Sequence, residues 1–274
     1  MKVWAVANQK GGVGKTTTVV SIGGELSARG LRTLVIDMDP HGSMTAYFKF
    51  DPDNIEKSIY QLFQAKADKS PIDPDQLIYP TRFARLSLMP ASTALATLDR
   101  QLGAVDGMGL VVAQALQNVT ADFDYVLIDC PPQLGVLMVN ALAACEHLII
   151  PVQTEFLALK GLERMERTLQ MMQRAQHKDL TYTILPTMFD RRTRASLGTL
   201  RILRERYREH VWRYMIPVDT QFREASRLGV PLCVSSPTDR GSQAYSDFLD
   251  FMLDEDSAKH TDTHDLDQPD KRSA

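Results

Sequence analysis

The sequence predicts an α/β fold, a doubly wound and mostly parallel sheet flanked by helices. Three observations predict it. Short apolar runs that suit buried parallel strands alternate with helical stretches along the chain. A glycine-rich loop joins the first apolar run to a helical stretch. Two later apolar runs end in acidic residues, which places carboxylates at the carboxyl edge of the sheet, where ligands bind in such folds.

The first strand is expected at VWAVA, residues 3–7, and the first helix from about Lys15 to Arg29. Between them lies NQKGGVGKTT, residues 8–17. Glycines there allow backbone N–H groups to converge on a phosphate, and the helix N-terminus adds roughly half a positive charge. The loop therefore predicts a phosphate site of the P-loop kind.

Two side chains of this loop suit phosphate chemistry. Lys15 can reach the β- and γ-phosphates of a nucleotide, and the Thr16 hydroxyl can bind Mg²⁺. Gln9 occupies the first glycine position of the usual pattern G-x-x-x-x-G-K-[ST]. The alternative is a glycine-rich turn without a ligand, which the order of strand, GKT and helix argues against.

Later elements follow the same alternation. TLVIDMDP at 33–40 is an expected strand ending in Asp37 and Asp39, and YVLIDCPP at 125–132 is another, ending in Asp129. Isolated acids at strand ends are often turn residues, but two such strands after a phosphate loop favour a metal site. Further strands are expected at residues 85–90, 147–152 and 182–187, and a small helical excursion from the sheet at 51–80.

A helix is expected over residues 161–176, with a regular apolar stripe. We interpret the stripe as facing the core, with a partner-binding groove as the alternative. The stripe consists of Leu162, Met165, Leu169 and Met172.

Composition narrows the class of protein. The chain has 274 residues, 44% of them hydrophobic, which is enough for one large domain with a buried core. A net charge of −3 excludes a global basic field for nucleic acid or an anionic membrane. Cys130, Cys145 and Cys233 are scattered and predict buried thiols, with no zinc or redox spacing. We expect a cytoplasmic protein, since neither a signal peptide nor a long apolar stretch is present.

The segment 255–274 is rich in charged residues and nearly free of apolar ones, which predicts a disordered polar tail after a domain spanning 1–254. A membrane-binding amphipathic helix needs an apolar face. The tail has none, so we expect no direct membrane anchor.

The segments KGGVGKTT, DMDPHGS, LIDCPPQLG, IPVQTEFLALKGL (150–162) and LPTMFDRRT (185–193) together resemble the ParA/MinD family of deviant Walker A ATPases. The resemblance runs from Met1 to about residue 253. It implies a P-loop ATPase that hydrolyses ATP with Mg²⁺ slowly and forms an ATP-dependent homodimer. Lys10 falls at the family's signature lysine, which reaches across the dimer to the partner's nucleotide.

The resemblance also implies roles for single residues. Lys15 binds phosphate, Thr16 binds Mg²⁺, and Asp39 is the acid that positions the attacking water. Asp37 and Asp129 support the metal. The cradle around the nucleotide comprises Gly11, Gly12, Val13, Gly14, Lys15, Thr16 and Thr17.

The segment DPHGSMTAYF at 39–48 is similar to the ParA homologue of chemotaxis and flagellar gene clusters, often called ParC. That likeness implies positioning of chemosensory arrays at a cell pole through a chemotaxis-linked adaptor. One alternative is a chromosome or plasmid partitioning ATPase on nucleoid DNA with a ParB-like partner. Another is a metabolic ATP-dependent enzyme of the same superfamily. His41 either tunes water positioning beside Asp39 or simply replaces a glutamine, and we favour the second.

Non-specific DNA is a further candidate partner. Residues 190–227 are rich in arginine and hold no lysine, and family members bind DNA phosphates through this part of the fold. The candidates are Arg192, Arg194 and Arg223. Val218 and Gln221 stand where the family pattern has arginines, and a solvated helix face is the alternative interpretation.

Overall fold

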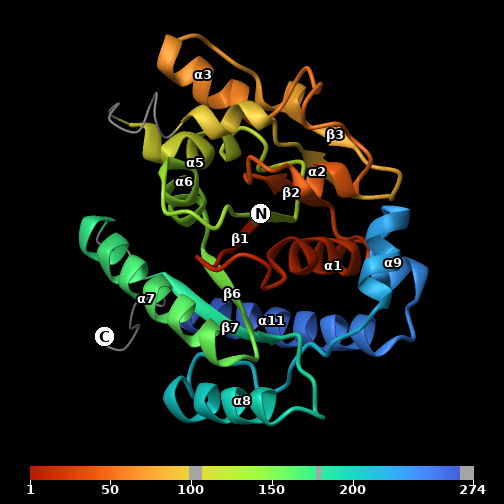
Figure 1. Ribbon diagram of the computed structural model, residues 1–274. Helices are drawn as coiled ribbons and strands as arrows, with labels where there is room; N and C mark the ends of the chain where they lie inside the picture. Colours follow the sequence, from red (N-terminus) through yellow and green to blue (C-terminus); the bar gives the residue numbers. More distant parts are fainter. Residues whose placement is uncertain (99–106, 177–179, 266–274) are drawn as a thin grey trace, which may run out of the picture.

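A seven-stranded sheet in the order β3-β4-β2-β5-β1-β6-β7 forms the centre of the molecule (Figure 1). All its pairings are parallel except that of β3 with β4. The computed structural model describes residues 1–98, 107–176 and 180–265. The strands are β1 Lys2–Val6, β2 Thr33–Asp37, β3 Tyr79–Pro80, β4 Leu86–Met89, β5 Tyr125–Asp129, β6 His147–Gln153 and β7 Thr181–Thr187.

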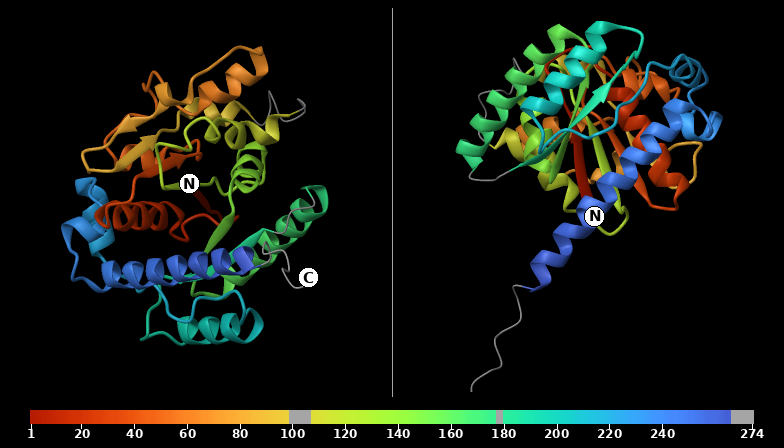
Figure 2. Two further views of the ribbon diagram at one scale, coloured as in Figure 1. Left: turned by 180° about the vertical axis from the view of Figure 1, so that it is seen from behind. Right: turned by 90° about the horizontal axis from the view of Figure 1, so that it is seen from below.

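Helices cover both faces of the sheet (Figure 2). Those of the first half are α1 Lys15–Ala28, α2 Ser43–Tyr47, α3 Tyr60–Asp68, α5 Val111–Leu116 and α6 Val136–Ala144. Those of the second half are α7 Phe156–Gln176, α8 Arg194–Arg206, α9 Gln221–Leu228, α10 Leu232–Ser235 and α11 Arg240–Asp265. The predicted α/β class with a mostly parallel sheet is confirmed.

The pleat of β1 divides the core into two layers. Val3 and Ala5 pack into a cluster with side chains of α3, α5, α6 and α7. Trp4 and Val6 pack on the opposite face with side chains of α1, α2 and α11. Alternate residues of a strand point to opposite faces, so a strand covered on both faces reads as a continuous apolar run.

The predicted elements appear close to their expected bounds. The region 51–80 leaves the sheet to form α3 and returns as β3, a strand too short to show a pattern in the sequence. In α7, Leu162 and Met165 are fully buried, and Leu169 and Met172 pack partly buried against the same core. The core-facing interpretation of this stripe is therefore confirmed.

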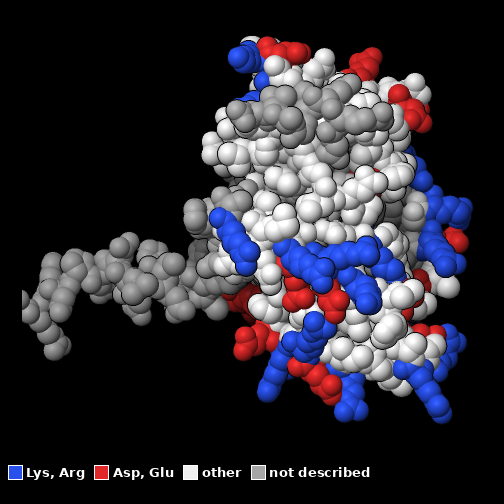
Figure 3. All heavy atoms as spheres, turned by 60° about the vertical axis from the view of Figure 1, so that its left-hand side comes forward, with Lys and Arg blue, Asp and Glu red and all other residues white. Residues whose placement is uncertain are grey.

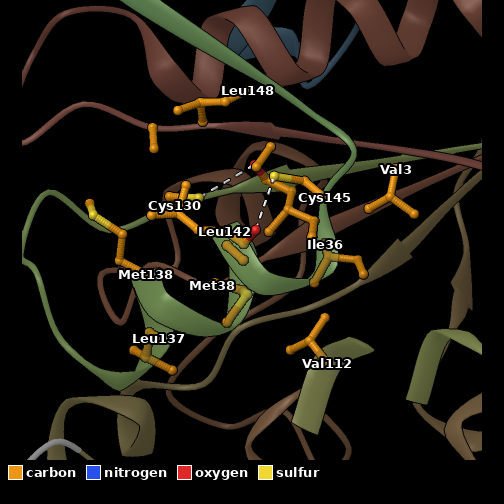
Figure 4. Close-up of a cluster of buried hydrophobic side chains, with 14 of the residues drawn as sticks. Val3, Ile36, Met38, Val112, Cys130, Leu137, Met138, Leu142, Cys145 and Leu148 are labelled. Carbon is orange, nitrogen blue, oxygen red and sulfur yellow. Dashed lines mark hydrogen bonds between the residues drawn. The ribbon is translucent and has the colours of Figure 1, made fainter. Parts of the chain in front are cut away.

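All three cysteines are free thiols, and the predicted burial is confirmed for Cys130 and Cys145, whereas Cys233 is only partly buried. Cys130 and Cys145 lie among apolar side chains such as Ile36, Met38 and Leu142 (Figure 4). Their thiols face the backbone oxygens of Ile128 and Leu142. Burial raises the pKa of the Cys130 thiol well above its usual range, which keeps it protonated and unreactive.

The predicted domain boundary at residue 254 stays a prediction. Helix α11 continues past it to Asp265, so residues 255–265 are helical where a disordered tail was expected. These residues include neither proline nor glycine, so nothing in them breaks a helix that begins earlier in the chain. The rest of the predicted tail, 266–274, lies outside the described residues. Within the described chain, no helix is long and apolar enough to cross a membrane.

Two helical glycines test how closely the helices pack. A Cβ on Gly24 of α1 would lie 2.4 Å from Pro231 Cβ, whereas one on Gly198 of α8 meets nothing within 4 Å. Gly24→Ala should lower the free energy of unfolding by about 1–3 kcal/mol through overpacking. Gly198→Ala should raise it by about 0.5–1 kcal/mol through helix propensity. Chemical denaturation measures both, and equal effects would contradict the close approach of α1 to α10.

Candidate nucleotide-binding site

The glycine-rich loop leaves the carboxyl end of β1 and is anchored on both sides. The Asn8 amide donates a hydrogen bond to the Pro151 carbonyl (2.8 Å) and accepts one from the Lys10 N–H (2.9 Å). On the other side, the Thr187 hydroxyl donates to the Val13 carbonyl (2.9 Å). These bonds tie the loop to β6 and β7, its neighbours at the same sheet edge.

Within the loop, Gly12 and Gly14 have φ angles of 74° and 94°. Side chains disfavour this left-handed region, so glycine is required where the loop turns into α1. A Cβ on Gly11 or Gly12 would meet no atom within 4 Å. The backbone thus leaves open space beside the N-terminus of α1, which suits an anion.

Lys15, Thr16 and Asp129 meet at this end of α1. Thr16 donates its hydroxyl hydrogen bond to Asp129 Oδ2 at 2.6 Å. Asp129 Oδ1 is buried and has no hydrogen-bond partner. The Lys15 ammonium lies 3.3 Å from the Lys10 carbonyl oxygen, folded back over the loop. A buried cation and an unpaired carboxylate oxygen therefore lie beside the phosphate cradle.

Asp37 and Asp129 are register partners on the neighbouring strands β2 and β5. Asp37 Oδ2 accepts hydrogen bonds from the Thr45 N–H and hydroxyl, both at 2.8 Å. Its Oδ1 accepts from the Asp39 N–H at 3.2 Å. Both oxygens are thus used to hold residues 39–45, and the metal-ligand role of Asp37 stays a prediction.

Burial sets the electrostatics of this pair. It raises the pKa of Asp37 to about 6, because desolvation outweighs the bonds from Thr45 and Asp39. It raises the pKa of Asp129 well above its usual range, and the nearby Asp37 adds to that shift while Thr16 and Lys15 oppose it. Two buried carboxylates at adjacent strand ends therefore favour a bound cation.

Asp39 lies on the loop between β2 and α2 with its side chain largely buried. Its Oδ1 accepts a hydrogen bond from the His41 N–H (3.0 Å) and lies 2.8 Å from His41 Nδ1. The imidazole itself is 78% exposed. His41 thus contacts the candidate catalytic acid directly. The sequence placed His41 beside Asp39, where a simple replacement of glutamine was the favoured interpretation, and the role of His41 stays a prediction.

Lys10 is turned away from Lys15. Its ammonium pairs with Glu155, the residue before α7, and lies 3.4 Å from Gln153 Oε1. The Lys10 and Glu155 side chains are 26% and 41% exposed. Lys10 is therefore held at the surface beside the cradle, within its own subunit.

A pocket of about 540 Å³ adjoins the loop on the α9 side. Its lining includes Gly14 and Thr17 of the loop region, together with Met188, Phe222 and Tyr245. A mainly apolar, partly aromatic pocket next to a phosphate cradle suits a nucleobase. Arg223, a DNA candidate from the sequence, lines this same pocket.

The other arginine candidates lie just before α8 and at its first residue. The Arg192 guanidinium donates two hydrogen bonds to the Asp190 carboxylate, at 2.9 and 2.8 Å, and the Arg192 side chain is 81% exposed. Arg194 is exposed at the first position of α8. Backbone pairing of Phe189 with Pro217 brings this loop beside the one that precedes α9. A DNA phosphate would therefore compete with Asp190 for Arg192.

The side chains present fit Mg²⁺ held partly by phosphate oxygens. Mg²⁺ takes one or two protein ligands with waters and phosphates rather than a full protein cage. In the described chain, no group of three or more His, Cys, Asp or Glu side chains is placed to hold a metal. Thr16 and the unpaired Oδ1 of Asp129 are the best-placed ligands.

Sequence reasoning missed several residues that shape the site. Glu155, which pairs with Lys10, lies in the segment IPVQTEFLALKGL that carries the family resemblance. The sequence therefore pointed to this segment, but not to the contact between Glu155 and Lys10. Thr45 and Tyr245 give no local signal. Tyr245 comes from α11, and its hydroxyl meets that of Thr18 at 2.9 Å.

Comparison with known proteins adds three findings. Residues 1–182 match the family described as an AAA domain. The sporulation initiation inhibitor protein Soj of Bacillus subtilis is 35% identical over 247 residues, which cover 90% of this chain and 96% of Soj. The chromosome partitioning protein ParA of Myxococcus xanthus is 33% identical over 245 residues, which cover 89% of this chain and 85% of that protein.

Among solved structures, one titled cobyrinic acid a,c-diamide synthase from Mycobacterium smegmatis, with bound ADP and magnesium, is similar over most of its length. Its TM-score is 0.79 at 35% identity, and the match covers 92% of this chain and 94% of that one. The same protein has also been solved with a bound ATP analogue and magnesium.

The unpaired carboxylate oxygen of Asp129 gives a stability test. Because its folded pKa lies above the unfolded one, its stabilising contribution is present only at low pH, and it is lost as the pH rises through the folded pKa. Asp129→Asn keeps an acceptor for Thr16 and removes the buried charge. At pH 7 with EDTA, it should raise the free energy of unfolding by about 1–3 kcal/mol.

The matched control is Asp124→Asn. Asp124 pairs with Arg32 near the surface, and this pairing lowers its pKa to about 2. Its ionised form favours the folded state above the unfolded pKa, so this variant should lose stability at pH 7. Urea denaturation measures both variants. A loss of stability in Asp129→Asn would contradict the assignment of an uncompensated buried charge.

Proposed function

The chain belongs to the ParA/MinD family of deviant Walker A ATPases, and we propose that it is an ATP-dependent dimerisation switch that partitions DNA-linked cargo. The family membership makes it a P-loop ATPase. Two relatives that match most of the chain are named as a chromosome partitioning protein and as Soj. A ParB-like protein is the corresponding stimulating partner, and nucleoid DNA the corresponding surface.

The observation that carries the proposal is that the two lysines of the loop make different contacts. Lys15 lies over its own loop, whereas Lys10 is held at the surface by Glu155. Lys15 is enough to bind phosphate within one subunit, so Lys10 is not needed for that purpose. Lys10 can act on the nucleotide of a second subunit that packs against this face, as an arginine finger does when it is supplied in trans.

Each residue of the site has a separate role in the proposed reaction. The loop N–H groups and Lys15 would hold the phosphates of ATP, and Thr16 with Asp129 would hold Mg²⁺, which would supply positive charge beside the phosphates. Asp39 orients the attacking water and accepts its proton. Its Oδ1 is engaged by His41, which leaves Oδ2 for that role.

Lys10 completes the reaction across the dimer. To reach the partner's nucleotide it must leave Glu155, so the ion pair opposes dimer formation until the nucleotide attracts the ammonium more strongly. Loss of the γ-phosphate after hydrolysis reverses that balance, and the subunits separate. A partly exposed ion pair contributes little free energy, so the Lys10–Glu155 pair weakens dimer formation without preventing it.

Chemosensory arrays are a second candidate cargo. The observation that favours them is the segment DPHGSMTAYF, with His41 in place of the glutamine of chromosome and plasmid members. In that case a chemotaxis-linked adaptor replaces the ParB-like partner, and the protein gathers at a pole rather than on the nucleoid. A chemotaxis gene cluster around this gene would favour this candidate.

A metabolic ATP-dependent enzyme is the third candidate, favoured by the 35% identity to a structure titled as a diamide synthase. The two classes differ in what triggers turnover. Phosphate release that requires a small carboxylic acid and no macromolecule would favour the enzyme. Release that rises with DNA and a ParB-like partner would favour partitioning.

The switch itself is tested with three variants. Lys15→Ala should abolish ATP binding and dimerisation together. Lys10→Ala should retain ATP binding but lose the dimer, because only the contact in trans is removed. Asp39→Ala should bind ATP and accumulate as a dimer with phosphate release reduced by about 10²-fold or more. Light scattering and phosphate-release assays measure these outcomes, and an ATP-dependent dimer of Lys15→Ala would overturn the proposal.

DNA contact is tested with Arg192→Ala, Arg194→Ala and Arg223→Ala. For a phosphate surface, each variant should weaken ATP-dependent binding to random duplex DNA irrespective of sequence and reduce its salt dependence. Arg223→Ala should also weaken nucleotide binding, since Arg223 lines the pocket beside the loop. Gel shifts across salt concentrations measure the effect. Unchanged shifts in Arg192→Ala and Arg194→Ala would remove the β7–α8 loop from the DNA surface.

A further inference from the structure

The loop between β2 and α2 contains a tight turn, DPHG at residues 39–42. The Gly42 N–H donates a hydrogen bond to the Asp39 carbonyl at 2.8 Å, which closes the turn. Aspartate at the first position, proline at the second and glycine at the fourth are residues that a turn of this kind favours. The turn therefore fixes the backbone of His41 directly beside the Asp39 carboxylate.

His41 directs two groups at one oxygen of that carboxylate. Its N–H donates to Asp39 Oδ1 at 3.0 Å, and its Nδ1 lies 2.8 Å from the same oxygen. An ionised carboxylate only accepts hydrogen bonds, so Nδ1 carries the proton in this contact. The backbone bond is open to any residue other than proline at this position, whereas the second bond depends on the imidazole. The two bonds together restrict rotation of the carboxylate.

No other basic side chain of the described chain takes part in this contact. Among the described residues, neither Lys nor Arg forms an ion pair with Asp39. Lys and Arg side chains gather instead on the side of the molecule that carries α7 and α8 (Figure 3). The Asp39 side chain is only 15% exposed, while the imidazole reaches it from solvent. His41 is therefore the basic side chain that contacts this carboxylate.

The second oxygen of the carboxylate, Oδ2, is left for a further contact. No hydrogen bond from another described residue reaches it. A hollow of about 140 Å³ adjoins Asp39 and His41 and is also lined by Pro131, Pro132 and Leu137. A space of this size holds a few water molecules. Water can therefore reach the carboxylate between the loops that follow β2 and β5.

We propose that His41 is a positioning residue of the ATPase reaction: its Nδ1–H holds Asp39 Oδ1, so that Oδ2 is presented to the attacking water. The inference rests on the proposed function, because it takes Asp39 as the acid that orients this water. His41 acts through Asp39 and contacts neither the nucleotide nor the reacting atoms. A carboxylate that is already oriented loses less rotational freedom when it binds the water, which favours the reaction.

The chemistry of residue 41 distinguishes this role from a simple replacement of glutamine. Asparagine carries its amide nitrogen at the same number of bonds from Cβ as Nδ1 of histidine, so it can donate to the same oxygen. Glutamine carries the nitrogen one bond further out and has to fold back to reach Oδ1, at a cost in side-chain entropy. Alanine keeps only the backbone bond. Positioning through Nδ1 therefore predicts that asparagine replaces His41 better than glutamine does.

Phosphate release from the full chain with ATP and Mg²⁺ tests this order. His41→Ala should lower kcat about tenfold and leave KM for ATP within about twofold, because the imidazole contacts Asp39 rather than the phosphate loop. His41→Asn should restore kcat to within about threefold of the wild type, and His41→Gln should stay close to His41→Ala. Equal kcat values for the asparagine and glutamine variants would overturn positioning through Nδ1.

The matched control is His210→Ala. His210 is another exposed histidine, which stacks on Tyr182 outside the site, so its removal should leave kcat unchanged. Circular dichroism and thermal melting confirm that all variants are folded. A loss of kcat in His210→Ala equal to that in His41→Ala would contradict a specific role for His41.

A double-mutant cycle separates positioning from a general effect on the site. In the Asp39→Ala background, His41→Ala should change single-turnover phosphate release by less than about twofold, since His41 acts through Asp39. A tenfold loss in both backgrounds, or a wild-type kcat for His41→Ala alone, would overturn this inference and leave the proposed function intact. Normal turnover of Asp39→Ala would instead refute the role of Asp39 in the proposed function, and the inference with it.

Discussion

Two buried carboxylates at neighbouring strand ends, Asp37 and Asp129, impose the main constraint on this site. Parallel register places them opposite each other, and burial makes both costly when they are ionised. The cost of burying each carboxylate is offset by hydrogen bonds and charges from a different segment of the chain. Thr45 and the backbone of the β2–α2 loop satisfy Asp37, and Thr16 with Lys15 partly satisfies Asp129. Because Asp129 keeps one oxygen unpaired, the phosphate loop and the β2–α2 loop meet at a place that favours a cation.

Local sequence patterns were enough to predict most of the fold. They also singled out Lys15 and Thr16 after the glycine-rich loop and Asp129 at the end of an apolar run, and the structure brings these three residues together at the start of α1, while their roles stay predictions. Contacts that depend on distant segments were not predictable. Glu155 reaches Lys10 only because β6 lies beside β1, and Tyr245 reaches Thr18 only because α11 packs on α1. The continuation of α11 to Asp265 was not predicted, because residues 255–265 are almost all polar and show no apolar stripe.

The arginine-rich region shows why composition is a weak guide to a partner. Arg192 is engaged by Asp190, Arg206 by Glu163 and Arg227 by Glu224. Arg201 pairs with Glu205 along α8. Exposed pairs of this kind are weak, so a phosphate can displace the acid, but the net attraction is smaller than the number of arginines suggests. On α7, the acids bond to residues at the end of α8 instead: Glu163 pairs with Arg206, and Glu166 accepts a hydrogen bond from the Tyr207 hydroxyl.

The position of α7 and that of the phosphate loop depend on each other. Lys10 pairs with Glu155 directly before α7, and the Gln9 amide donates a hydrogen bond to Thr168 within it, so a movement of α7 would change the phosphate site. The Lys10–Glu155 pair is partly exposed, so its energy is small and can be offset by a few new contacts elsewhere on the helix. A fully buried pair would be much harder to separate. The partial exposure of the Lys10–Glu155 pair therefore suits the proposed switch, in which Lys10 has to leave Glu155 to reach the nucleotide of the other subunit.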